Sequence, residues 1–270
     1  MPELKNTSFK LLDWYKSIGI DICVQNSPRK RFKSIKVNNK ENIYPDKINN
    51  LKDLEKQIYK FNGSELKTTA TKLVFGDGNP KSKIMLIGEA PGYEEDKLGK
   101  PFVGAAGKKL DQMINAIGLD RKNNTYITNI IPWRPPNNRT PTDNEINFFL
   151  PYVEEHISII KPKILLLFGN VASKSLLKLK DGITKNHGKW FNYKNPFLKK
   201  KIFTTCIFHP SYLLRSPNKK KIAWENLKKV KEKIKSEIKK VRIAIIVTSI
   251  SVFAFRILFS IKAPLKPLTK

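Results

Sequence analysis

The chain has 270 residues, 40% of them hydrophobic, so it is long enough to bury a full core in one main domain with appendages. The chain has 52 lysine and arginine residues and 23 acidic residues, which gives a net charge of +29. This charge predicts a polyanionic partner, either nucleic acid or an anionic membrane, although an AT-rich genome would account for part of the lysine excess. The two cysteines, Cys23 and Cys206, are far apart and have no metal-ligand spacing, which argues against a cysteine-based zinc or iron–sulfur site and fits a reducing cytoplasm. The chain starts without the apolar core of a signal peptide, so secretion is not expected.

The first 50 residues are predicted to form an appendage. A short helix is expected from Phe9 to Ile18, and the polar, basic segment from residue 28 to residue 50 is typical of a linker. The predicted domains are therefore an N-terminal helix with a basic linker (1–50), a main domain (51–240) and an apolar C-terminal tail (241–270).

Strand-like and helical runs alternate through the main domain. A helix is predicted over Leu51–Phe61, and Thr142 with Glu145 forms a capping box at the start of a later helix. Strands that alternate with helices indicate an α/β fold with a parallel sheet and helices on both faces. The predicted strands are Lys83–Ile87, Thr125–Ile131, Lys163–Phe168 and Ile202–Phe208, and the remaining predicted helices are Ala106–Ile117, Thr142–Ile160, Val171–Leu179 and Asn218–Lys240.

The C-terminal tail is different in character. Ile243–Ile261 is almost wholly apolar and is interrupted by Arg256, and its length is close to the ~20 residues that span a bilayer. Two readings stay open: membrane association through residues 241–262, or an appendage that packs elsewhere or is an accidental extension.

Each predicted strand ends in a distinctive polar segment. The carboxyl ends of parallel strands meet at one edge of a sheet, where open α/β sheets place their ligand sites. We therefore expect one composite pocket that contains Glu, Phe, Asn and His side chains. The segments are Gly88–Asp96 followed by Gly99–Gly107, then Asn129–Thr142, Gly169 with Asn170, and His209–Arg215.

These side chains suit a planar, polar heterocycle. The Asn129 amide can read a donor and acceptor edge, the Phe102 ring can stack, and His209 can donate to an oxygen that becomes anionic. Nearby arginines suit phosphates, so the set fits a nucleobase taken out of a nucleic-acid stack. Each residue alone also has a structural reading: Glu89 and Asn129 could cap turns, Phe102 could belong to the core, and His209 could be a buried structural histidine.

The segments GEAPGYEED, KPFVGAAG, TNIIPWRPPNNRTPT and HPSYLLR, in this order, resemble the family 4 uracil-DNA glycosylases of bacteria and archaea. The resemblance runs from about Asn62 to Leu227. It implies a three-layer α/β/α sandwich with a central four-stranded parallel sheet. It also implies a bacterial cytoplasmic or nucleoid enzyme that flips uracil out of DNA and hydrolyses its N-glycosidic bond.

The resemblance also assigns roles to residues. Phe102 would stack on the flipped uracil, Asn129 would pair with its polar edge, and His209 would stabilise the departing uracil anion. Glu89 would position or activate the water, with Glu95 as a second candidate. The backbone at Gly88, Ala90 and Gly92 would shape the pocket floor. Leu213 and Leu214 would wedge into the DNA, or else begin a helix face, and Arg215 would lie close to the phosphates. Independently of the resemblance, Arg134 and Arg139 suit phosphates by their charge, and Ser211 is a further candidate for DNA contact.

One departure from the family pattern concerns its iron–sulfur cluster, which four cysteines usually hold. The matching positions here are Phe61, Ser64, Trp133 and Phe148, none of which is a thiolate. We therefore expect a member without a cofactor, in which packing has replaced the cluster.

The sequence thus predicts a monofunctional DNA N-glycosylase of base excision repair. Its partner would be uracil-containing DNA, single- or double-stranded, and no obligate protein partner is expected. Two rivals stay open: a catalytically silent reader of uracil or abasic-site DNA, and a nucleotide hydrolase on the same fold.

Overall fold

The computed structural model describes residues 50–237. The predicted helix Phe9–Ile18, nearly all of the basic linker and the apolar tail lie outside these residues. Within residues 50–237, no helix has both the length and the apolar character needed to cross a membrane. The membrane reading of residues 241–262 therefore stays a prediction.

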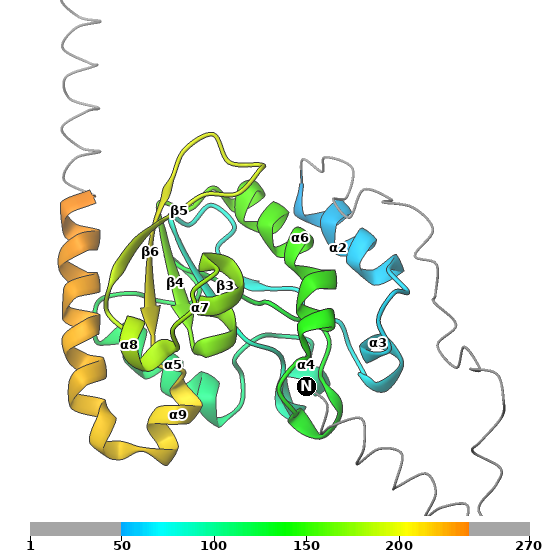
Figure 1. Ribbon diagram of the computed structural model, residues 1–270, viewed down its shortest axis with the longest axis horizontal. Coiled ribbons are helices and arrows are strands. Elements are labelled where there is room, and N and C mark those ends of the chain that lie inside the picture. The colour runs from blue at the N-terminus through cyan, green and yellow to red at the C-terminus, as the bar shows by residue number, and fades with distance from the viewer. Residues whose placement is uncertain (1–49, 238–270) are drawn as a thin grey trace, which may run out of the picture. The chain divides into compact units, whose positions relative to one another are not determined.

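The centre of the main domain is a six-stranded mixed sheet in the order β1-β3-β2-β4-β6-β5 (Figure 1). The four predicted strands are its parallel core, which confirms the expected sheet. They are β3 (Tyr126–Asn129), β2 (Ile84–Gly88), β4 (Ile164–Phe168) and β6 (Ile202–Ile207).

Two antiparallel edge strands were not predicted. β1 (Asp77–Gly78) pairs with β3 and has only two residues, which is too short for any periodic signal. β5 (Trp190–Tyr193) pairs with β6, and its partly exposed residues mark it as an edge strand.

The longer helices follow the prediction, whereas α3, α4 and α8 are too short to give a helical period. The predicted last helix starts after a 3₁₀ turn, and its described part covers residues 220–237. The elements are α2 (Leu51–Lys60), α3 (Leu66–Thr69), α4 (Tyr93–Leu98), α5 (Ala105–Asn115), α6 (Asp143–Ile160), α7 (Asn170–Leu177), α8 (Ile183–Asn186), α9 (Pro210–Arg215) and the 3₁₀ turns η1 (Pro136–Asn138) and η2 (Pro217–Lys219).

Helices cover both faces of the sheet because its central strands are apolar on both sides. In β2, Met85 and Ile87 pack toward α2, α6 and α7, while Ile84 and Leu86 pack toward α5, α9 and the helix of residues 220–237. Successive strand residues point to opposite faces, so a continuous apolar run serves two cores at once. The result is the three-layer α/β/α sandwich (Figure 1).

The predicted capping box fixes the start of α6. The Thr142 hydroxyl accepts from the Glu145 N–H at 3.3 Å, and the Glu145 carboxylate accepts from the Thr142 N–H at 2.8 Å. The start of α6 ends the long loop that follows β3, so the cap fixes one end of a loop at the carboxyl edge of the sheet.

Candidate active site

The ends of β2 and β3 place three of the predicted residues together. Gly88 pairs with Asn129 in the strand register, and both lie on the sheet face that packs against α5. A methyl group on Gly88 would lie 2.4 Å from Phe102 Cζ and 2.5 Å from Asn129 Oδ1. Only glycine therefore lets the ring and the amide approach the strand this closely.

Asn129 is 4% exposed, and its Oδ1 has no hydrogen-bond partner among the described residues. Buried polar atoms are normally paired, because an unpaired one costs about 1–3 kcal/mol. An unpaired amide oxygen beside a glycine and an aromatic ring is suited to a ligand donor.

The loop that carries Phe102 is held by a residue that the sequence analysis missed. Phe102 has a left-handed φ of 54°, and a side chain at Gly107 would lie 1.9 Å from the Phe102 carbonyl oxygen. The Arg121 guanidinium donates to the carbonyls of Pro101 at 2.8 Å and Phe102 at 2.6 Å. Its charge is balanced by Asp77 and Asp111, at 3.1 and 3.2 Å. Sequence gave no signal for Arg121, because the residues it bonds lie 10 to 44 positions away.

His209 lies beside Phe102, with 5.6 Å between the ring centroids and 33° between the ring planes. Its Nδ1 accepts from the Ser211 backbone N–H at 3.2 Å and lies 2.7 Å from the Ser211 hydroxyl. Because a backbone N–H can only donate, the proton of the neutral ring is on Nε2. Burial, with a smaller contribution from Arg215, lowers the pKa of His209 to about 4, so the ring is neutral at pH 7.

The two predicted acids have different surroundings. Glu89 follows Gly88 directly and is half-buried, and burial raises the pKa of its carboxyl group above the ordinary value. Glu95 is occupied by backbone: one oxygen accepts from Val103 and Gly104, both at 2.9 Å, and the other from Gly92 at 3.1 Å. Glu95 thereby joins the start of α4 to the loop that carries Phe102. Ala90 is half-buried and packs against the core on the α6 side of the sheet.

The predicted wedge pair is split by α9. Leu213 is 1% exposed and packs in the core, whereas Leu214 is 46% exposed. Adjacent helix residues point about 100° apart, so one faces the sheet and the next faces outward. Leu213 therefore lies in the core of this structure, whereas Leu214 and the exposed Arg215 form the surface of this helix.

The other arginines lie on the loop after β3. Arg134 is over the Tyr93 ring, 5.1 Å from its centroid, and donates to Asn138. Arg139 forms two hydrogen bonds with Glu145, at 2.8 and 2.6 Å, which lower the pKa of that carboxyl to about 2. Arg139 therefore anchors the loop to α6, and Arg134 has fewer protein contacts. The basic residues Lys199–Lys201 lie elsewhere: they precede β6, at the opposite edge of the sheet from His209.

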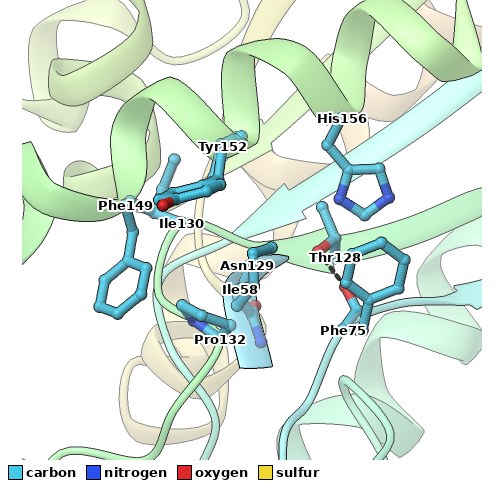
Figure 2. A pocket seen from close by; sticks show the side chains of 10 residues that line it. Ile58, Phe75, Thr128, Asn129, Ile130, Pro132, Phe149, Tyr152 and His156 are labelled. Atoms are coloured by element: carbon cyan, nitrogen blue, oxygen red, sulfur yellow. Dashed lines mark hydrogen bonds between the residues drawn. The ribbon is translucent and has the colours of Figure 1, made fainter. Parts of the chain in front are cut away.

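Figure 2 shows a cavity between the end of β3 and α6, lined by Asn129, Phe75 and His156 among others. Its volume is about 10 Å³, which holds one water at most. His156 is buried there against Phe75 and bonds to Tyr126, as expected for a structural histidine. This cavity is too small to hold a base.

The four positions at which the family resemblance implies cluster ligands do not fit an iron–sulfur cluster. They hold Phe61, Ser64, Trp133 and Phe148, and no side chain among them is a thiolate. The Phe61 and Phe148 rings pack together with centroids 6.1 Å apart, and Trp133 is buried 6.2 Å from the Tyr59 ring. Among residues 50–237, no group of three or more His, Cys, Asp or Glu side chains could hold a metal.

An aromatic ring, an amide oxygen without a partner among the described residues and a neutral histidine thus meet at the carboxyl edge of the sheet, beside a half-buried glutamate. Such a set of side chains is suited to a planar, polar heterocycle, as in enzymes that act on a nucleobase.

Residues 75–228 match the Uracil DNA glycosylase superfamily, and the chain belongs to this family. It is 40% identical over 190 residues to the type-4 uracil-DNA glycosylase of Sulfurisphaera tokodaii, which covers 68% of this chain and 85% of the relative. The type-4 enzymes of Archaeoglobus fulgidus and Thermotoga maritima are 35% and 36% identical, and each alignment covers 68% of this chain and 94% of the relative.

Proposed function

We propose that the protein is a monofunctional uracil-DNA glycosylase of base excision repair. Its substrate is uracil-containing DNA, single- or double-stranded, and its products are free uracil and an abasic site. The observation that carries the proposal is the grouping of Phe102, Asn129 and His209 around Gly88, in a chain similar to type-4 uracil-DNA glycosylases.

Binding of the flipped base is assigned to Phe102 and Asn129. The ring stacks on the uracil, and the amide offers an acceptor and a donor side by side, which match uracil N3–H and O4. Asn129 Oδ1 has no partner among the described residues and uracil N3–H supplies one, so binding offsets the cost of burying this oxygen.

The bond from N1 of uracil to C1′ of the sugar breaks with its electron pair going to the base. The negative charge develops on uracil O2, where His209 Nε2–H donates. A neutral imidazole that Ser211 holds in one tautomer is a preorganised donor, and it needs no proton from solvent.

Water then adds to C1′, and its proton passes to a carboxylate. We assign this role to Glu89, because its oxygens have no backbone partner among the described hydrogen bonds, whereas Glu95 already accepts three. Glu95 is a positioning residue that holds the Phe102 loop. Leu214 is the wedge that fills the vacated stack, and Arg215 and Arg134 contact phosphates.

The proposal is tested with a defined oligonucleotide that contains a single uracil. Free uracil and alkali-labile abasic sites are expected from the full chain. Tight binding without release would favour a silent reader, and release from free deoxyuridine nucleotides but not from DNA would favour a nucleotide hydrolase.

Glu89→Gln is expected to lower kcat about 10²-fold and to remove the acid limb of the pH–rate profile. In the wild type the rate should rise with pH through the raised pKa of Glu89, above its usual 4.5.

The same substitution should also change the stability of the protein. A folded-state pKa raised by burial means that folding favours the protonated form of Glu89, and this stability is lost as pH rises through the folded pKa. The neutral Gln should therefore raise Tm at pH 7, and a lower Tm or an unchanged acid limb would contradict the assignment.

Arg121→Gln is expected to lower kcat/KM about 10–10²-fold, because the loop that presents Phe102 loses its two carbonyl anchors. Inhibition by free uracil should weaken in parallel, and Arg121→Lys should restore part of both. If Tm falls while uracil inhibition is unchanged well below Tm, Arg121 supports the fold but does not position Phe102.

We infer that this member of the family works without an iron–sulfur cluster. The inference rests on the non-ligating side chains at Phe61, Ser64, Trp133 and Phe148 and on the ring packing around them. The purified full chain is expected to lack broad visible absorption and stoichiometric iron while it releases uracil. A brown preparation with stoichiometric iron would overturn it.

We propose a cytoplasmic or nucleoid location, because the proposed substrate is cellular DNA. Fractionation of cells that express the chain with and without residues 241–270 decides whether the tail adds membrane contact.

A further inference from the structure

A basic groove lies on the surface between α2 and the segment of residues 70–73. Its volume is about 820 Å³, and it is open to solvent. Five lysines line it against one acidic residue, Glu55; they are Lys52, Lys56, Lys60, Lys67 and Lys72. We call this surface the lysine groove.

Two aromatic residues belong to the lysine groove. Tyr59 is 59% exposed, which is unusual for a large ring, and the Lys67 ammonium lies 4.9 Å from its centroid. Lys67 also donates to the Tyr59 carbonyl and to Asn62, so the ring is held from one side by a fixed cation. An exposed, fixed ring is suited to stack on a base.

Trp133 lies 6.2 Å from Tyr59 and is only 3% exposed. Its indole N–H is buried without a hydrogen-bond partner among the described residues, although a buried indole N–H usually has one. Trp133 therefore contributes its ring to the wall of the lysine groove beside Tyr59, while its indole N–H is too buried to meet a ligand there.

The lysine groove is joined to the active site through α4. The N–H groups of Thr71 and Lys72, on its wall, donate to the buried Asp96 of α4 at 2.8 and 3.0 Å. Arg134, next to Trp133 in the chain, lies over Tyr93 at the start of the same helix. The residue before Tyr93 is Gly92, which Glu95 ties to the Phe102 loop.

From these contacts we propose that the lysine groove binds single-stranded DNA that flanks the flipped uracil. A strand that leaves the pocket passes over α4, where Arg134 meets a phosphate, and enters the groove. There the lysines neutralise phosphates, and one base stacks on Tyr59. The inference rests on the proposed glycosylase function and adds the path of the substrate strand.

The test compares single-stranded substrates of about 5 and about 25 nucleotides with a central uracil, over a range of salt concentrations. The triple variant Lys52→Gln/Lys56→Gln/Lys60→Gln changes only exposed side chains of α2. Loss of three phosphate contacts should reduce the slope of log kcat/KM against log salt by about 2 on the long substrate. It should leave the short substrate unchanged.

The matched control removes the same charge at the opposite edge of the sheet, with Lys199→Gln/Lys200→Gln/Lys201→Gln. This variant should keep the wild-type slope on the long substrate. Tyr59→Ala should lower kcat/KM about tenfold on the long substrate only, and Tyr59→Phe should retain it.

If the groove variants lose the same kcat/KM on the short and the long substrate, or lose none on either substrate, the proposal is overturned. The proposal is also overturned if the groove variant keeps the wild-type kcat/KM and DNA affinity but no longer binds polyglutamate, because the partner of the groove would then be an acidic protein. If the wild type releases no uracil from either substrate, the glycosylase function fails. Fluorescence anisotropy of the same labelled 25-mer then still reports whether the groove variant loses DNA affinity relative to the control.

Discussion

His209→Ala is expected to lower kcat about 10²–10³-fold while salt-dependent DNA affinity changes little. The imidazole donates to the base only as charge develops on the leaving uracil, so its loss falls on the transition state. One preorganised donor in a water-poor site contributes roughly 3–4 kcal/mol to such a step. Single-turnover release of uracil measures the chemical step separately from binding.

The matched control is His187→Gln. His187 is also bonded through Nδ1, to Asn226 at 2.9 Å, and also packs on an aromatic ring, that of Phe208. It lies outside the pocket, so turnover should stay within a few-fold even if Tm falls. Turnover by His209→Ala within a few-fold of wild type would remove this residue from the mechanism. Because the pKa of His209 is about 4, its titration should not shape the rate above about pH 5.

Gly88→Ala is expected to be as damaging as loss of a catalytic side chain, although it adds only a methyl group. The new Cβ would lie 2.4 Å from the Phe102 ring and 2.5 Å from the Asn129 amide oxygen, so both must move. A displacement of about 1 Å in a positioning group can cost ~10²-fold in rate. Uracil inhibition should weaken as well, because both groups bind the base.

Gly182→Ala is the corresponding control. Gly182 has an ordinary backbone φ of −74°, and a methyl group there would meet only the Asn170 amide, at 3.4 Å. It should keep wild-type kinetics, with both variants checked by thermal unfolding. A Gly88→Ala enzyme with unchanged kcat/KM and uracil inhibition would show that the ring and amide do not form the base pocket.

The alternation of apolar strands and amphipathic helices was enough to predict the parallel core of the sheet and its helical layers. β2, β3, β4 and β6 are short apolar runs that end in glycine, polar or aromatic turns, and the segments between them are long enough for at least one helix. The edge strand β1 was not predicted, because only its pairing with β3 makes these two residues a strand. Pairing between distant segments leaves no local pattern.

Sequence motifs also predicted that Gly88, Phe102, Asn129 and His209 lie together, because each stands at a strand end or in the loop after it, and the structure brings these four residues together. The motifs could not separate Glu89 from Glu95, or Leu213 from Leu214. Those distinctions depend on which side chain has backbone partners and which faces the core.

The sequence by itself determined the fold class, the edge of the sheet that carries the site and the residues that meet there. These follow from local periodicity and from the rule that parallel strands bring their carboxyl ends together. Only the tertiary structure decided how those residues are held and poised: the Arg121 clamp on the Phe102 loop, the tautomer that Ser211 imposes on His209, and the lysine groove beside α4. These three features depend on burial or on distances between segments far apart in the chain, and local sequence predicts neither burial nor such distances.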